Sequence, residues 1–304
     1  MAAVIEVEGL AKRYGSTVAV EDVSFQVAAG EIFGILGPNG AGKTTTVECV
    51  QGLRERDGGR IQVLGLDPRE HAATLRRRIG CQLQESALPD RIKVWEALDL
   101  FSSVTPGGAD WRTLLGQWDL AAKAKASFAS LSGGQRQRLF VALALVNEPE
   151  VVFLDELTQG LDPAARRVAW DSIRAIRERG ATVVLVTHYM DEAEELCDRL
   201  AIVDRGRVVA LGTPREIVTR TARAIRVRFS TDHPDVAWLG DVAHVRKVER
   251  RGATVEVEGT GPVLPLVAAA LVGRGIVPWD LRAEQPSLED AYLDLTGRTT
   301  QGAG

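Results

Sequence analysis

The chain has 304 residues, a net charge of −4 and a pI of about 5.7. Hydrophobic residues make up 45% and charged residues 26% of it, a globular composition that excludes disordered and fibrous proteins and allows two domains. Because basic residues are not in excess, we expect no nucleic-acid partner.

Cysteine and apolar patterns indicate the compartment. The three cysteines are widely spaced and odd in number, which predicts small buried residues in a reducing cytosol and neither a disulfide framework nor a zinc site. The first residues do not resemble a signal peptide. The longest uncharged apolar run, 261–273, contains two prolines and is shorter than the roughly 20 residues of a spanning helix. We expect a soluble chain whose membrane role comes through a partner.

Strand and helix patterns alternate along the first two thirds of the chain. Strands are predicted at 4–8, 23–27, 31–36, 151–154, 182–186 and 200–203. Helices are predicted at 43–53, 134–146, 163–178 and 190–197. This order is typical of an α/β fold with a parallel sheet wrapped by helices.

Two segments depart from this alternation. Residues 92–128 are helical around a Pro106-Gly107-Gly108 loop, so we expect a helical subdomain at about 86–140. After Thr213-Pro214 the composition changes and strands are predicted at 224–229 and 253–258, with helices at 263–273 and after Ser287. We therefore divide the chain into a sheet domain, 1–220, and a small α+β domain, 221–304.

A phosphate-binding loop follows the strand at 31–36. Its sequence is Gly37-Pro38-Asn39-Gly40-Ala41-Gly42-Lys43-Thr44, a full match to the phosphate-loop pattern, and Thr45 follows it. Glycines let backbone amides turn toward phosphate oxygens, and a helix that begins near Lys43 adds its positive end. Lys43 supplies a point charge for the β- and γ-phosphates, and the Thr44 hydroxyl can bind Mg²⁺. The loop predicts ATP as the ligand, with Thr45 among its contacts.

A second motif ends an apolar strand with two carboxylates, Asp155 and Glu156. The carboxyl end of a parallel strand is where such sheets bind ligands. In this position Asp155 can hold Mg²⁺ directly or through water, and Glu156 can orient and polarise the attacking water.

A third motif, Leu131-Ser132-Gly133-Gly134-Gln135, begins another helix and is also suited to anion binding. One γ-phosphate does not need two cradles in one chain. We therefore interpret Ser132 to Gln135 as contacts for a nucleotide held by another copy.

Taken together, these motifs over residues 4–215 resemble the ATP-binding subunits of ABC transporters in order and approximate spacing. The resemblance implies a P-loop NTPase (RecA-like) core with an antiparallel β edge and a helical insert. It also implies that Gln84 senses Mg²⁺ and the γ-phosphate, that His188 contacts the γ-phosphate, that Asp162 supports the dimer interface and that Tyr14 stacks on adenine. Leu157 departs from the family, which usually has proline there, but no catalytic group is lost.

The segment 286–298 is similar to the end of drug-efflux ATPases of the daunorubicin-resistance type. Ser287 and Asp290 form a capping-box-like start, and Leu288, Ala291, Tyr292 and Leu295 fall on one face of the helix that follows. Only the resemblance suggests export.

The function implied is a transport ATPase at the cytoplasmic face of the cell membrane. Two copies, most simply a homodimer, sandwich two ATP molecules and drive a separate transmembrane permease. An importer ATPase with a regulatory C-terminal domain and a non-transport ABC ATPase are the alternatives. An importer ATPase of this kind would have a larger, strand-rich barrel at its C-terminus. Among non-transport ABC ATPases, translation factors carry two cassettes in one chain, and chromosome-maintenance ATPases carry a long coiled coil. The sequence does not name a transported substrate.

Overall fold

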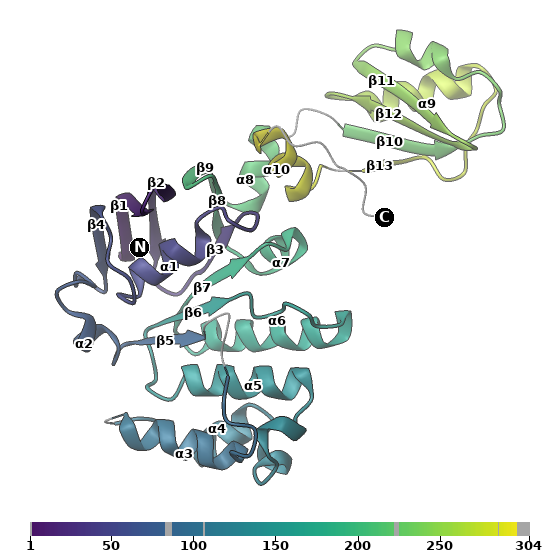
Figure 1. The fold of residues 1–304 in the computed structure, drawn as a ribbon. Helices are drawn as coiled ribbons and strands as arrows, with labels where there is room; N and C mark the ends of the chain where they lie inside the picture. Colours follow the sequence, from purple (N-terminus) through teal and green to yellow (C-terminus); the bar gives the residue numbers. More distant parts are fainter. Residues whose placement is uncertain (1, 83–86, 106, 222–224, 285, 297–304) are drawn as a thin grey trace. The chain divides into compact units, whose positions relative to one another are not determined.

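The computed structural model describes residues 2–82, 87–105, 107–221, 225–284 and 286–296 (Figure 1). The chain forms two compact units, Met1–Pro214 and Arg215–Gly304. The division follows Pro214, whereas the sequence analysis divides the chain after residue 220. Each unit is described by itself below.

The first unit is built on a nine-stranded sheet with the order β4-β1-β2-β9-β8-β3-β7-β6-β5. Strands β5, β6, β7, β3 and β8 pair in parallel, whereas β4, β1 and β2 form an antiparallel edge that β9 joins to the rest. The strands span Ala3–Tyr14 (β1), Thr17–Ala28 (β2), Ile32–Leu36 (β3), Gly58–Val63 (β4), Ile79–Gln82 (β5), Val151–Asp155 (β6), Thr182–Thr187 (β7), Arg199–Asp204 (β8) and Arg207–Gly212 (β9). The α/β fold with an antiparallel edge is confirmed.

The central strands β3, β6 and β7 are buried along their whole length, as expected for a sheet covered on both faces. The helices of this unit are α1 (Lys43–Val50), α2 (Ala72–Leu75), α3 (Val94–Val104), α4 (Trp111–Gln117), α5 (Gly133–Ala144), α6 (Pro163–Glu178) and α7 (Met190–Leu196). Helices α3, α4 and α5 lie together beyond strand β5 (Figure 1) and form the predicted helical insert.

Strands β4, β5 and β9 were not predicted from the sequence. Their exposed or glycine-containing positions weaken the alternation that identifies a strand, and pairing with a neighbour decides their conformation. β1 and β2 are also longer than predicted, because each runs to the tight turn that joins them.

The second unit has a four-stranded sheet in the order β11-β12-β10-β13, all antiparallel. Its elements are α8 (Pro214–Thr221, one residue of which precedes the unit), β10 (Ile225–Ser230), β11 (Val245–Arg251), β12 (Thr254–Gly259), α9 (Val263–Gly273), β13 (Arg282–Glu284) and α10 (Leu288–Thr296). Val227, Phe229, Val257 and Val267 belong to its own buried core. The unit has the small α+β architecture expected from the sequence.

Ser287 begins helix α10 as predicted. Its backbone amide donates to Asp290 Oδ2 at 2.9 Å, and the Asp290 amide donates back to Ser287 Oγ at 3.2 Å. Leu288, Ala291 and Tyr292 are buried, so the apolar face of α10 is covered. Among the described helices of the chain, none combines the length and apolarity needed to cross a membrane.

Candidate nucleotide-binding and hydrolysis site

The loop between β3 and α1 is held in a shape that only small residues allow. Gly40 and Gly42 have φ angles of 79° and 98°, in the region that favours glycine. A Cβ on Gly37 would lie 2.2 Å from Val203 O, and one on Gly42 would lie 2.4 Å from Ala19 O. The glycines at 37 and 42 are therefore required by the close approach of β8 and β2, in addition to any contact with phosphate.

Lys43, the first residue of α1, is held inside this loop. Its Nζ donates to Gly37 O at 2.9 Å and to Pro38 O at 3.1 Å, and only 4% of the residue is exposed. Burial lowers the pKa of its ammonium group, whereas Glu156 and Asp155 act in the opposite direction. The cation thus lies between the loop carbonyls and the two carboxylates of the neighbouring strand.

Asp155 and Glu156 lie at the carboxyl end of β6, as predicted. Glu156 turns the chain sharply: its φ is 50°, and its amide donates to Val186 O at 2.9 Å. Its Oε1 lies 4.0 Å from Lys43 Nζ and 3.2 Å from His188 Nδ1. Three side chains predicted as catalytic therefore meet around one carboxylate oxygen.

Lys43 and Glu156 line an open cavity of about 330 Å³. Its lining consists of Ala19, Asn39, Gly40, Gly42, Lys43, Thr44, Thr45 and Glu156. Most of the predicted phosphate-loop contacts are thus brought together with the predicted general base. Backbone amides, a buried cation and a carboxylate around one opening suit a phosphate ester and a water that attacks it.

Asp155 has the environment of a metal ligand. It is 3% exposed, and its Oδ1 is buried without a hydrogen-bond partner. Burial and the adjacent Glu156 raise the pKa of its carboxyl to about 6, against the opposing effects of Lys43 and of the Thr44 hydroxyl. A carboxylate oxygen without a partner, next to a threonine hydroxyl, fits the oxygen ligands that Mg²⁺ prefers.

The residues Ser132 to Gln135 of the third motif, called the signature below, form a separate feature. Ser132 is the N-cap of α5, where it forms a capping box: its amide donates to Gln135 Oε1 at 3.1 Å, and the Gln135 amide donates to Ser132 Oγ at 3.4 Å. Gly133 follows the cap, and a Cβ there would lie 3.8 Å from Leu161. None of Ser132, Gly133, Gly134 and Gln135 lines the phosphate-loop cavity.

Asp162 begins α6 and acts as a helix cap. Its Oδ1 accepts from the amides of Ala164 at 2.9 Å and Ala165 at 2.8 Å. Within a single copy this side chain is thus occupied by its own helix. Leu161, which precedes this cap, lies 3.8 Å from where a Cβ on Gly133 would be, so the signature and the start of α6 are next to each other.

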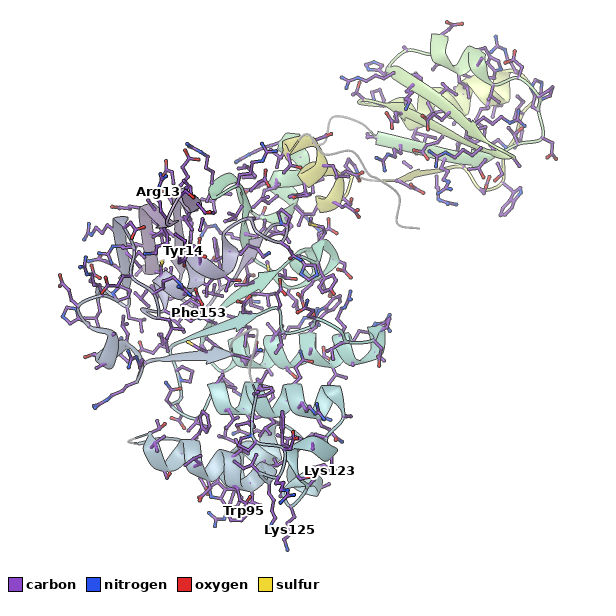
Figure 2. All side chains as sticks on the ribbon, in the orientation of Figure 1. Arg13, Tyr14, Trp95, Lys123, Lys125 and Phe153 are labelled. Carbon is purple, nitrogen blue, oxygen red and sulfur yellow. The ribbon has the colours of Figure 1, made fainter. Side chains whose placement is uncertain are left out.

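Of the two remaining predicted residues, Tyr14 and Gln84, the structure describes Tyr14. Tyr14 ends β1 beside Arg13 (Figure 2), is 40% exposed and has the Arg54 guanidinium 5.2 Å from its ring centroid. It does not line the phosphate-loop cavity. Gln84 lies outside the described residues.

The sequence reasoning missed Ala19, which lines the cavity from β2. A single alanine in an edge strand carries no recognisable signal, and only the pairing of β2 next to the phosphate loop identifies it. It also missed Glu192, a fully buried carboxylate in α7. A glutamate buried in a short acidic helix could have been suspected only from its position four residues after His188.

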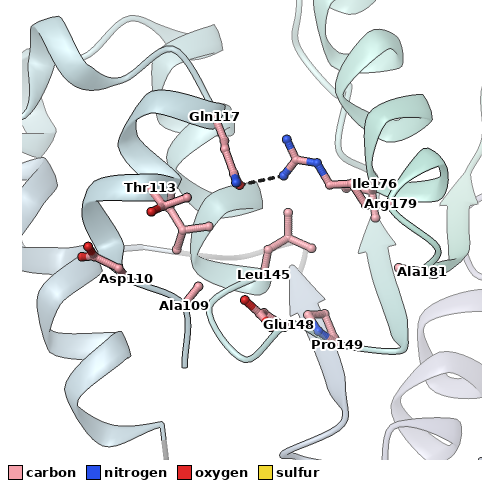
Figure 3. Close-up of a pocket in the computed structure, with 11 residues that line it drawn as sticks. Ala109, Asp110, Thr113, Gln117, Leu145, Glu148, Pro149, Ile176, Arg179 and Ala181 are labelled. Carbon is pink, nitrogen blue, oxygen red and sulfur yellow. Dashed lines mark hydrogen bonds between the residues drawn. The ribbon is translucent and has the colours of Figure 1, made fainter. Parts of the chain in front are cut away.

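A second cavity, of about 360 Å³, lies between α4, the end of α5 and the end of α6 (Figure 3). Arg179 Nη1 donates to Gln117 Oε1 at 2.7 Å across it, which joins the insert to α6. No residue predicted to contact nucleotide lines this cavity. It is therefore distinct from the candidate site.

Comparison with known proteins agrees with this geometry. The ABC transporter family profile matches residues 20–159. The chain is 39% identical to a daunorubicin resistance ATP-binding protein of Streptomyces coeruleorubidus, over 96% of both chains. It is 38% identical to the Nod factor export ATP-binding protein I of Ralstonia nicotianae, over 97% of this chain and 94% of that protein.

Solved structures match about seven tenths of the chain. An ATP-binding subunit of an ABC transporter has a TM-score of 0.64 at 30% identity and covers 71% of this chain and 92% of its own. An ATP-binding cassette in its ADP conformation has a TM-score of 0.65 at 23% identity, covers 73% and 95%, and supports the fold alone. Full-length similarity, the phosphate loop and the fold agree: the chain belongs to the ATP-binding subunits of ABC transporters and is an ATPase.

Proposed function

We propose that two copies of this chain enclose two ATP molecules between them and, by closing and reopening, drive export through a separate permease at the cytoplasmic face of the cell membrane. One observation supports the proposal that the chain works as a dimer. The phosphate loop, Glu156 and His188 gather at one site, whereas the anion-binding start of α5 at Ser132 is not part of it. A second copy facing the first would supply the missing cradle.

Within each composite site the chain's residues have separate tasks. The loop amides and Lys43 bind the phosphates, and His188 contacts the γ-phosphate. Glu156 orients water for in-line attack and accepts its proton. Asp162 supports the dimer interface, Tyr14 stacks on adenine, and Gln84 senses Mg²⁺ and the γ-phosphate.

Thr44 and Asp155, with Gln84, would hold Mg²⁺. When bound, the ion neutralises charge that develops on the phosphate oxygens. The unpartnered Asp155 Oδ1 supports this assignment from the side of the protein.

Export is favoured by the relatives that match along nearly the whole chain. Their names refer to daunorubicin resistance and to Nod factor export. Since the similarity extends beyond the ATPase core, it includes the C-terminal segment. We propose drug-like or other hydrophobic compounds as the transported class.

The surface of α3 supports a permease contact. Leu100, Phe101 and Val104 are 52%, 40% and 70% exposed, although they are large apolar side chains on one short helix. Exposed apolar groups of this kind commonly mark a surface that a partner covers. We propose that the insert meets the permease there.

Light scattering tests the dimer. Glu156→Gln keeps the shape of the site but removes its base, so ATP with Mg²⁺ should trap a dimer that disperses when EDTA is added. If this variant does not dimerise at any ATP concentration, either alone or in the presence of the permease, the two-copy sandwich model is contradicted. Inside-out vesicles carrying the permease test direction: export predicts ATP-dependent uptake into them, and import predicts release.

A further inference from the structure

Helix α7 carries a carboxylate that surface exposure and charge pairing do not explain. Glu192 is 0% exposed, four residues after His188. Its Oε1 accepts a hydrogen bond from Trp170 Nε1 of α6 at 3.0 Å. Glutamate is rarely buried to this degree without a specific function or partner.

Two threonine hydroxyls lie beside the same carboxylate. Burial raises the pKa of Glu192, and hydrogen bonding from Thr187, Thr158 and Trp170 acts against that effect. Thr158 and Thr187 are themselves 0% and 1% exposed. Thr158 follows Glu156 by two residues, and Thr187 immediately precedes His188. Through Trp170 of α6, the carboxylate thus links α7, which follows His188, to the helix that follows Glu156.

The other links between α6 and α7 differ in kind. Arg166 with Asp191, at 2.9 Å, and Arg174 with Glu195 are ion pairs between partly exposed side chains. Such pairs contribute little to rigidity because water competes for both charges. The hydrogen bond between Trp170 and Glu192 is part-buried and ends on a fully buried carboxylate, so water competes less for it and it is better able to fix the relative position of the two helices.

We propose that Glu192 is a positioning residue for hydrolysis, which holds the segments after β6 and after β7 so that Glu156 and His188 meet. This inference rests on the roles proposed above for those two residues. It assigns to Glu192 no contact with nucleotide. Its loss should therefore slow the chemical step and leave ATP binding largely intact.

The test measures kcat and KM for ATP in the full chain with its permease. Glu192→Leu removes both acceptor oxygens at similar volume, and we expect kcat to fall by about ten- to a hundredfold, the scale of displaced catalytic groups, with KM changed less than about twofold. Glu192→Gln keeps an acceptor for Trp170 and should restore kcat to within about threefold of the wild type. Trp170→Phe, which removes one N–H but keeps an aromatic ring, should lower kcat in the same way if Glu192→Leu does not fold.

Glu195→Gln is the matched control. It removes an exposed ion pair with Arg174 from the same helix and should leave kcat unchanged. Normal kcat in folded Glu192→Leu and Trp170→Phe would overturn the proposal, and so would an equal loss in Glu192→Gln and Glu192→Leu. Glu156→Gln and His188→Ala are measured alongside: full activity in these two would contradict the proposed site itself, whereas their inactivity with an active Glu192→Leu would contradict only the inference.

Discussion

His188 Nδ1 lies 3.2 Å from Glu156 Oε1, although the two residues are 32 positions apart in the sequence. The contact exists because β6 and β7 pair in parallel and end at the same edge of the sheet. The same carboxylate oxygen lies 4.0 Å from Lys43 Nζ. Lys43 and His188 can thus be substituted one at a time without substituting Glu156.

Replacing Glu156 by glutamine should separate binding from chemistry. The amide keeps the size of the side chain but cannot accept a proton from water, so turnover should fall at least about a hundredfold, the usual effect of losing a general base. Phosphate release measures turnover, and a fluorescent nucleotide measures affinity. Wild-type turnover in this variant would show that another group activates the water.

Lys43→Ala should abolish productive ATP binding. The substitution removes a charge partner of the phosphates and also two hydrogen bonds, to Gly37 O and Pro38 O, that shape the loop. Titration with a fluorescent nucleotide measures the loss. Lys247→Ala, which breaks an ion pair with Glu249 in the second unit, is the control and should bind ATP normally. Retained affinity in folded Lys43→Ala would exclude the assigned site.

Asp155→Asn should abolish hydrolysis and yet stabilise the isolated chain. The pKa of this carboxyl is raised to about 6 from its ordinary value of 3.8, so the folded protein binds the proton more tightly than the unfolded one. The resulting stability is present below about pH 4 and is lost as pH rises through about 6. Above that range the buried charge costs about 1–3 kcal/mol, which asparagine avoids.

Thermal unfolding in EDTA without nucleotide tests whether Asp155→Asn stabilises or destabilises the chain. The variant should melt higher than the wild type near pH 8, and the difference should shrink toward about pH 4. A lower melting temperature for Asp155→Asn near pH 8 would mean that the Thr44 and Lys43 contacts outweigh the cost of burial.

The signature should act on the other copy's nucleotide. Ser132→Arg introduces a bulky cation at the start of α5, and Lys43→Ala disables the phosphate loop. Mixing the two inactive variants should restore part of the ATPase activity, because each heterodimer has one intact composite site. Native mass spectrometry verifies that heterodimers form; their presence without any activity would argue against a head-to-tail arrangement.

The C-terminal unit should affect assembly more than chemistry. It has its own sheet and core, and the residues that line the phosphate-loop cavity all precede residue 157. A chain that ends at Arg220 should bind ATP with near-native affinity but lose dimer stability or coupling to the permease. Nucleotide titration and co-purification measure the two properties separately. Loss of ATP binding in a folded truncation would contradict this division.

The sequence predicted what local chemistry determines. The phosphate loop, the carboxylates after β6 and the helices 163–178 and 263–273 depend on residue type and spacing, and the structure gives these helices the same bounds. Long-range pairing determines the rest. Strand β5 becomes a strand because it pairs with β6, and Glu192 is recognisable only once α6 lies against α7. The chance of finding either from sequence is low, because neither has a periodic or motif-like signal.

The left-handed backbone of Glu156 has a consequence for engineering this enzyme. A φ of 50° costs energy for any residue with a Cβ, so glycine at this position would relieve strain and remove the base in one step. Because the buried charge at Asp155 is also destabilising, Asp155 and Glu156 are two adjacent positions at which a substitution can raise thermal stability while it removes turnover. A library sorted for thermal survival alone would therefore enrich inactive variants here, and a useful selection must also demand transport.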